Sequence, residues 1–265
     1  MKPFLVKPAS SFHGDIFFLG DKSIATRAVI ISAISKGKTV IYNFPPSKDC
    51  FSAISSLKEL GVKIKQKKLS RNFCQIKNKK FLQNKSAKTI TVFGRGRYGL
   101  KKPIRPIFTG ESGTTLRLIL GVLAGQNYTV TLKAAKSLSK RPMLRVTLPL
   151  RKMGAQIKGT VYPNTVSRTP YPALEEYPPI TIKGGALKSI SYRLPVASAQ
   201  VKSAIMLAGL YAKGLTKVVE PVKTRDHSER MLKLFQAGIK VKKNEILIKG
   251  NKELVSPGLL YIPGD

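Results

Sequence analysis

The chain has 265 residues, of which 48 are Lys or Arg and 13 are Asp or Glu, and its formal net charge is +35. An apolar fraction of 42% allows a sizeable core and excludes a disordered polymer. No apolar run approaches the ~20 residues of a membrane-spanning helix, and the first residues, MKPFLVKPAS, resemble neither a signal peptide nor a transit peptide. We expect one large domain or two small ones, located in the cytoplasm.

Lysines are spread along the whole chain, and the densest clusters, at 63–68 and 77–80, lie beside predicted strands. Few aromatic residues interleave with them and Trp is absent, so no stacking platform for single-stranded nucleic acid is evident. We therefore predict a solvated, lysine-rich surface that attracts small anionic substrates. A basic nucleic-acid-binding module remains the alternative, supported by the charge alone.

Cysteine usage argues against metal and disulfide chemistry. Cys50 and Cys74 form neither a Cys-x-x-Cys pair nor a ligand cluster with His13 or His227. We interpret them as unpaired thiols in a reducing compartment, and we predict neither a metal nor a cofactor.

In chain order, the sequence contains three similar units. The first reads GDKSIATRAVIISAISKGKTVIYNF (20–44) and KDCFSAISSLKELGVKIK (48–65). After a glycine-rich stretch, FGRGRYG (93–99), that we predict to be a turn, the second reads GESGTTLRLILGVLAGQNYTVTLKA (110–134) and RVTLPLRKMGAQIKG (145–159). The third reads SAQVKSAIMLAGLYAKGLTKVVEP (198–221) and HSERMLKLFQAGIKVKK (227–243). In each unit the pattern predicts a helix, a glycine and a β run, followed by a second helix, a second glycine and a second β run.

The glycines and the apolar spacing support this assignment. The first glycines, Gly37, Gly125 and Gly214, lie about 88 residues apart, and we expect a left-handed backbone where they close their helices. Each unit has a second glycine and a β run that opens on a valine (Gly61, Gly154 and Gly238; Val40, Val130 and Val218). The predicted fold is an α/β domain of three helix–strand–helix–strand repeats, with helices packed together and sheets around them. An open doubly wound sheet is disfavoured, because no Rossmann-type glycine fingerprint follows a first strand.

The first helix of each unit begins with small and polar residues, at 20–23, 110–115 and 197–200. A helix N-terminus offers unpaired N–H groups and partial positive charge to an anion. Ordinary capping by Asp21, Ser112 and Ser198 is the alternative for any single helix. Because each beginning also has Lys or Arg within about a turn, we favour an anion site on one face of the domain (Lys22, Arg27, Arg117, Lys202).

These segments carry a family resemblance. GDKSIATRA, SGTTLRLILGVLAG, SLSKRPM, LPVASAQVKSAIMLAGL, TRDHSERML and the final IPGD resemble, in order and over essentially the whole chain, the signature segments of the enolpyruvyl transferases. The resemblance is to the 5-enolpyruvylshikimate-3-phosphate (EPSP) synthases, which transfer the enolpyruvyl group of phosphoenolpyruvate to shikimate 3-phosphate in aromatic amino-acid biosynthesis. It implies half of an inside-out α/β barrel.

The resemblance also implies site residues. Lys22 would lie between the two substrates as the catalytic residue. Shikimate 3-phosphate would be held at its carboxylate end by Ser23 and Arg27, and at its phosphate by Ser198, Ala199 and Thr224. Phosphoenolpyruvate would be held by Gly113, Thr114 and Arg141, and Gln200 would contact both substrates. Asp49 matches a recurrent acid of the family, for which we favour a structural or capping role.

Departures from the family pattern are small. Glu111 replaces a common asparagine and Thr224 a usual serine, and neither puts the family in doubt. The sister family that acts on UDP-N-acetylglucosamine remains an alternative. It would be expected to show Lys-Asn where this chain has Lys22-Ser23, and it often has a cysteine before an Arg-Pro pair such as Arg141-Pro142.

The resemblance further implies a second domain of similar build. We expect residues 1–18 to form strands that cross into it, 19–252 to form the substrate-binding domain, and 253–265 to begin the second domain. The missing part would supply the acids, the Glu/Lys pair and the further arginines of the reaction. We therefore expect an incomplete chain, with a separate C-terminal half as a candidate partner, that binds shikimate 3-phosphate weakly and does not turn over alone.

Overall fold

Three successive units make up the part of the chain that the computed structural model describes, which comprises residues 18–68, 73–76, 79–82, 86–163 and 174–264 with Pro8, Ser10, Ser11 and His13. The first unit contains α1 (Lys22–Ala33), β1 (Lys38–Phe44), α2 (Lys48–Glu59), β2 (Lys63–Lys68), the hairpin β3 (Phe73–Ile76) and β4 (Lys79–Leu82), and β5 (Lys88–Phe93). The second contains β6 (Ile107–Phe108), α3 (Gly113–Leu123), β7 (Thr129–Lys133), α4 (Lys136–Ser139), α5 (Leu144–Lys152), β8 (Gln156–Pro163) and β9 (Leu174–Lys183). The third contains β10 (Ser191–Arg193), α6 (Ala199–Gly209), β11 (Leu215–Val219), α7 (His227–Leu234), β12 (Gly238–Lys242) and β13 (Glu245–Lys249), and β14 (Leu259–Tyr261) follows it.

Each unit builds a four-stranded sheet with the same order of strands. The orders are β14-β1-β5-β2, β6-β7-β9-β8 and β10-β11-β13-β12. In each sheet the first two strands are parallel and the other pairs are antiparallel. The predicted helix–strand–helix–strand order is confirmed in all three units. The inner antiparallel strands β5, β9 and β13 and the parallel edge strands β6 and β10 were not predicted from the sequence.

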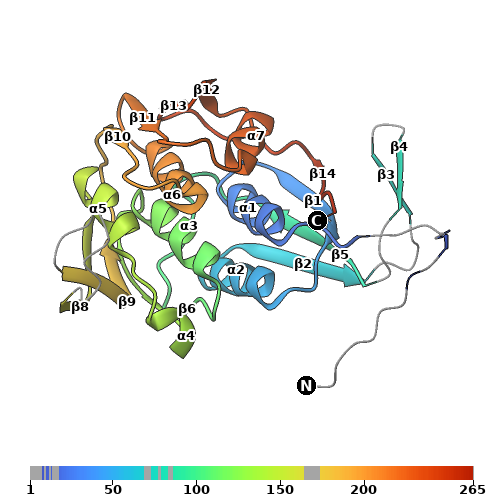
Figure 1. Ribbon diagram of the computed structural model, residues 1–265, viewed down its shortest axis with the longest axis horizontal. Helices are drawn as coiled ribbons and strands as arrows, with labels where there is room; N and C mark the ends of the chain where they lie inside the picture. Colours follow the sequence, from blue (N-terminus) through green and yellow to red (C-terminus); the bar gives the residue numbers. More distant parts are fainter. Residues whose placement is uncertain are drawn as a thin grey trace.

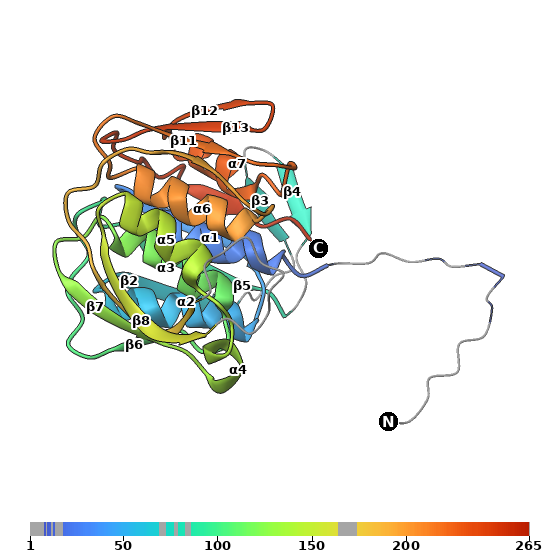
Figure 2. The ribbon, with the colours of Figure 1, turned by 60° about the vertical axis from the view of Figure 1, so that its left-hand side comes forward.

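The helices occupy the interior and the three sheets lie around them (Figures 1 and 2). Helices α1, α3 and α6 are buried along nearly their whole length, and each of them also buries a charged side chain (Arg27, Arg117 and Lys202). Helix α3 packs against both α1 and α6, and a Cβ atom on Gly121 would lie 2.3 Å from the carbonyl oxygen of Ala204, so the glycine permits this close approach. With helices inside the sheets, the open doubly wound alternative is excluded.

The glycines that close the first helices differ from one another. Gly37 and Gly214 have φ of +95° and +93°, as predicted. Gly125 is not in the left-handed region, so that prediction is wrong. Helix α3 continues in right-handed geometry through Ala124, and the ring of Tyr211 occupies the space where a Cβ atom of residue 125 would be, at 2.1 Å. The glycine is therefore needed for packing.

We expect Gly125→Ala to lower the free energy of unfolding by about 1–3 kcal/mol, because the buried Tyr211 ring must move to admit the methyl group. Gly185→Ala is the matched control, since a Cβ atom there has no neighbour within 4 Å and the change is expected to stay within about 0.5 kcal/mol. Thermal unfolding of both variants checks this. Equal midpoints for the two variants would contradict it.

The glycine-rich stretch at 93–99 forms a turn, as predicted, with Gly96 at φ +73°. Buried Arg97 fastens this turn to the end of α6 through the carbonyl oxygen of Leu210, at 2.6 Å, and pairs with Glu253. The turn thus connects the first and third units, and its role is structural.

The end of the described chain returns to the first unit. Strand β14 runs parallel to β1, Leu260 and Ile262 are buried, and Gly264 bridges to Gly20 (Figure 1). Most of segment 1–18, for which crossing strands were predicted, lies outside the described residues. In the described part of the chain, no helix is both long and apolar enough to cross a membrane.

Candidate functional site

The N-terminal ends of the helices meet on one side of the helical core. Lys22, at the start of α1, forms an ion pair with Asp49 in the first turn of α2, at 2.8 Å. The Thr115 hydroxyl in α3 donates to the carbonyl oxygen of Asp49 at 3.4 Å, and Gln200 in α6 donates to the Thr114 hydroxyl at 2.9 Å. The predicted convergence of the helix beginnings on one face is therefore confirmed.

The predicted capping alternative also holds at all three helices. Asp21 accepts from the Ile24 N–H, Ser112 from the Thr115 N–H at 3.2 Å, and Ser198 from the Val201 N–H at 3.4 Å. Each cap satisfies one of the four N–H groups that a helix leaves unpaired at its start. Capping therefore does not exclude anion binding, since the other first-turn N–H groups remain available to a ligand.

Arg117 and Gln200 join α3 to α6 at the centre of this face. Arg117 Nη1 donates to Gln200 Oε1 at 2.7 Å, and burial, together with the charges of Arg145 and Arg141, lowers the pKa of Arg117 to about 10. The arginine is only 3% exposed, and its Nε has no hydrogen-bond partner among the described residues. A Cβ atom on Gly113 would lie 2.8 Å from Arg117 Nη1, so the glycine makes room for the guanidinium.

Arg141 and Arg145 flank this centre without a balancing acid. Within the described residues, neither of them nor Arg117 forms an ion pair. Their segment is fastened to β9, because the Leu144 N–H donates to Glu175 Oε1 at 3.0 Å. Three positive charges held together without a counter-charge are suited to a small dianion. From the sequence, Arg117 was predicted only as a nearby charge, and Arg145 was not predicted. Their positions, on the inner side of α3 and at the start of α5, are the features that could have identified them.

Lys22 is a half-exposed ammonium group held over the start of α2. Its hydrogen bond and charge interaction with Asp49 raise its pKa above the usual lysine value. It therefore stays protonated at neutral pH, and its side chain is 58% exposed. Asp49 acts through this ion pair, and it does not cap α2, whose cap position is Ser47.

We expect Asp49→Asn to lower the pKa of Lys22 toward its ordinary value, because both the acceptor charge and the ion pair are lost. Since Asp49 raises the folded-state pKa, its stabilising contribution is fully present below the unfolded lysine pKa and disappears as the pH rises through the folded value. A pH titration of the Lys22 side chain by NMR measures the change. An unchanged Lys22 pKa would contradict the assigned pairing.

Ser23 and Arg27 lie together, but Arg27 points inward. It is 2% exposed, and burial lowers its pKa to about 10. Its nitrogens donate to Ser228 Oγ at 2.7 Å, to Ser203 Oγ at 3.2 Å, and to both the carbonyl and the hydroxyl oxygen of Ser23. Arg27 thereby joins α1, α6 and α7 beneath the face on which the N-terminal ends of the helices meet.

Contrary to our expectation, Lys202 does not supply positive charge to the face on which the N-terminal ends of the helices meet. It is fully buried and pairs with Glu220 at 2.9 Å and with Glu229 at 2.6 Å. The reason is its position on the fourth residue of α6, which faces α7 and the end of β11. Glu220 also accepts from the N–H and the hydroxyl of Thr224, which lies half-buried near the start of α7.

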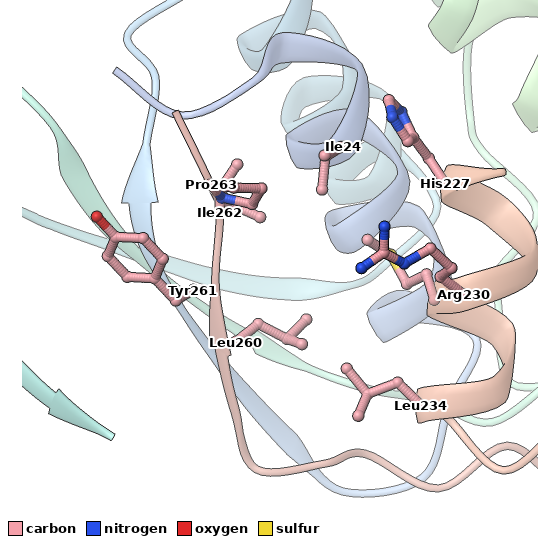
Figure 3. Close-up of a pocket in the computed structure, with 9 residues that line it drawn as sticks. Ile24, His227, Arg230, Leu234, Leu260, Tyr261, Ile262 and Pro263 are labelled. Carbon is pink, nitrogen blue, oxygen red and sulfur yellow. The ribbon is translucent and has the colours of Figure 1, made fainter. Parts of the chain in front are cut away.

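A groove of about 520 Å³ borders this face between α1, α7 and β14 (Figure 3). Ile24, Leu234 and Leu260 form apolar walls, and Arg230 extends between them. His227 stands at the upper end, where burial and the charge of Arg27 lower its pKa, so it is neutral at pH 7. The groove thus differs from the cationic centre in its mainly apolar walls.

Among the described residues, no three side chains of His, Cys, Asp or Glu gather as metal ligands would. Cys50 is a free thiol whose pKa is raised to about 11 by burial. The side chain of Cys74 lies outside the described part of the structure.

Comparison with known proteins gives consistent matches. The family model "EPSP synthase (3-phosphoshikimate 1-carboxyvinyltransferase)" matches residues 6–265. Curated proteins named 3-phosphoshikimate 1-carboxyvinyltransferase are 41% identical in Bacillus licheniformis and 43% identical in Geobacillus kaustophilus, each over 256 residues. A solved EPSP synthase from Acinetobacter baumannii superposes with a TM-score of 0.78 at 38% identity, covering 95% of this chain and 50% of that one. The two curated matches cover 97% of this chain, which spans about half the length of these relatives (52% of each).

Proposed function

Since the chain belongs to the EPSP synthase family, we propose that it provides the substrate-binding domain for transfer of the enolpyruvyl group from phosphoenolpyruvate to shikimate 3-phosphate. The observation that carries this proposal is the face on which the N-terminal ends of the helices meet. There Gln200 hydrogen bonds to Arg117 and Thr114. Arg141 and Arg145 lie near Arg117, and none of the three arginines forms an ion pair within the described residues. This face suits two small polyanions bound side by side.

For shikimate 3-phosphate, we assign Ser23 and Arg27 to the carboxylate end, and Ser198, Ala199 and Thr224 to the phosphate. The hydrogen bonds from Arg27 to Ser23 and Ser203 support this assignment, because they place the starts of α1 and α6 beside each other. In this arrangement Ser23 contacts the ligand directly, and Arg27 supports it from below.

For phosphoenolpyruvate, we assign Gly113, Thr114 and Arg141, with Lys22 and Gln200 contacting both substrates. The absence of a balancing acid near Arg141 within the described residues supports a dianion at this place. The glycine allows the phosphate to approach the first N–H groups of α3 closely.

The reaction adds a substrate hydroxyl to the central carbon of phosphoenolpyruvate while the terminal carbon takes up a proton, and then eliminates phosphate with loss of a proton. This chain's residues hold both anions in contact and keep the Lys22 ammonium at their junction, which lowers the entropic and electrostatic cost of the transition state. Proton-transfer groups and further arginines are assigned to the remainder of the relatives' length.

The proposal includes the division into 1–18 as crossing strands, 19–252 as the substrate-binding domain and 253–265 as the start of the second domain. A second half, which corresponds to the part of the relatives that the match leaves uncovered, is the proposed partner. We place the protein in the cytoplasm, where a free thiol such as Cys50 persists.

Calorimetric titration of the purified chain with shikimate 3-phosphate tests this function. We expect saturable binding, and phosphate release from both substrates only after addition of the part of the Bacillus licheniformis relative that the match leaves uncovered. No binding of shikimate 3-phosphate with or without that part would refute the proposal. Affinity for nucleic acid that falls steeply with salt and ignores shikimate 3-phosphate would favour the basic-module alternative. Binding of UDP-N-acetylglucosamine instead would favour the sister activity.

A further inference from the structure

A buried group of three charges lies beneath the loop that carries Thr224. Lys202 is 0% exposed, Glu220 2% and Glu229 4%, and the lysine donates to both carboxylates. Replacing such buried ion groups with apolar residues is often neutral or stabilising. Stability alone is therefore a weak reason for three charges here, and a role in positioning is the better one.

Glu220 is fixed from several directions. Its Oε2 accepts from Lys202 at 2.9 Å, its own N–H donates to the Asn244 carbonyl oxygen at 2.9 Å, and its carbonyl oxygen accepts from Asn244 Nδ2 at 2.8 Å. The remaining Oε1 accepts from the Thr224 N–H at 3.2 Å and from the Thr224 hydroxyl. The turn from residue 220 to residue 224 therefore closes around a single anchored carboxylate.

The rest of this loop has no apolar anchor. Residues 221–223 and Arg225 are exposed, and buried structure resumes at Ser228, which hydrogen bonds to Arg27 and Ser203. Thr224 thus lies in a largely exposed loop, and both its N–H and its hydroxyl donate to Glu220 Oε1.

We propose that Glu220, held and neutralised by Lys202, positions Thr224 for the 3-phosphate of shikimate 3-phosphate, an inference that rests on the proposed function. In the free chain the Thr224 hydroxyl donates to Glu220. On binding, this hydroxyl turns to the phosphate while the Thr224 N–H stays on Glu220 Oε1. Lys202 offsets the carboxylate charge that would otherwise repel the phosphate at this short range. Glu220 is a positioning residue, since it acts through Thr224.

The test compares two ligands that differ only in the phosphate. The full chain, Glu220→Ala and Glu220→Gln are titrated by calorimetry with shikimate 3-phosphate and with shikimate. We expect Glu220→Ala to weaken shikimate 3-phosphate binding about tenfold and shikimate binding less than about twofold. Glu220→Gln should recover most of the loss, because its amide oxygen still accepts from the Thr224 N–H.

Two further variants serve as the control and as a safeguard against misfolding. Glu245→Ala removes a half-exposed acid paired with Lys217 and should leave both affinities unchanged. Glu220→Asp keeps the charge beside Lys202 but shortens the reach to Thr224, so it should show the same phosphate-selective loss even if Glu220→Ala does not fold. An equal loss for both ligands, or no loss, overturns the inference while leaving the proposed function intact. If the unmodified chain binds no shikimate 3-phosphate, both fail.

Discussion

Lys202→Met is expected to lower the free energy of unfolding by about 3–5 kcal/mol at pH 7. The methionine fills a similar volume, but Glu220 and Glu229 would lose the cation that lies 2.9 Å and 2.6 Å from them. Breaking a buried ion pair from one side leaves an uncompensated charge in a low-dielectric interior, and that residual charge accounts for the large effect. Urea unfolding followed by circular dichroism measures it.

Lys217→Met is the matched control for this effect. Lys217 pairs with Glu245 at 2.6 Å, but both side chains are more than a third exposed, so the expected change is about 0–1 kcal/mol. Burial already raises the pKa of Glu229 above the usual value for a glutamate. Without Lys202 this carboxyl should protonate more readily, so the destabilisation should shrink as the pH falls toward the usual glutamate pKa. A loss as small as that of Lys217→Met, or one independent of pH, would contradict the assigned role of the three charges.

The second large effect is expected at Arg141. We predict that Arg141→Ala weakens phosphoenolpyruvate binding, measured with shikimate 3-phosphate present, by about 30-fold or more. Truncating one partner of a hydrogen-bonded charge pair costs about 2 kcal/mol or more. No acid among the described residues competes for this arginine, and Arg117 and Arg145 lie near enough to influence one another. Calorimetry on the chain, with the complementing half present if required, gives the affinity.

Lys140→Ala is the control for Arg141. It removes an exposed positive charge one residue away, so any general change in the electrostatic field is similar, and we expect an effect of about twofold. Shikimate 3-phosphate affinity should change little in either variant. Equal losses for Lys140→Ala and Arg141→Ala would show that the net charge of the chain, and not a defined contact, attracts phosphoenolpyruvate.

The triple repeat was predictable because it is a local pattern. Helical spacing of apolar residues, a glycine after each helix and a valine-led β run recur three times, and each feature reports a backbone preference of nearby residues. Strands β5, β9 and β13 were not predicted, although they were predictable. The segment KTITVF of β5, for example, alternates between polar and apolar residues, as strands do. The edge strands β6 and β10 are only two or three residues long, so they had too little pattern to detect.

The candidate site, like the fold, was predictable only in part. Residues at the helix beginnings were predictable from capping chemistry and from the family motifs, which are short and continuous. The direction of a charged side chain was not. Lys202 lies near the start of α6 and Arg27 in the second turn of α1. Lys202 nevertheless pairs with two glutamates, and Arg27 donates to Ser203 and Ser228 on helices distant in sequence as well as to Ser23.

By itself the sequence determined the α/β class, the number of units, the family and the helix ends that are proposed to bind anions, because these depend on periodicity and short motifs. Only the tertiary structure decided which charges lie at the N-terminal ends of the helices without an ion pair and which neutralise one another inside. It also decided that Gly125 is needed for contact with Tyr211 and not for its backbone conformation. The physical reason is that burial and pairing are set by packing between units about 90 residues apart, a separation over which no local pattern in the chain carries information.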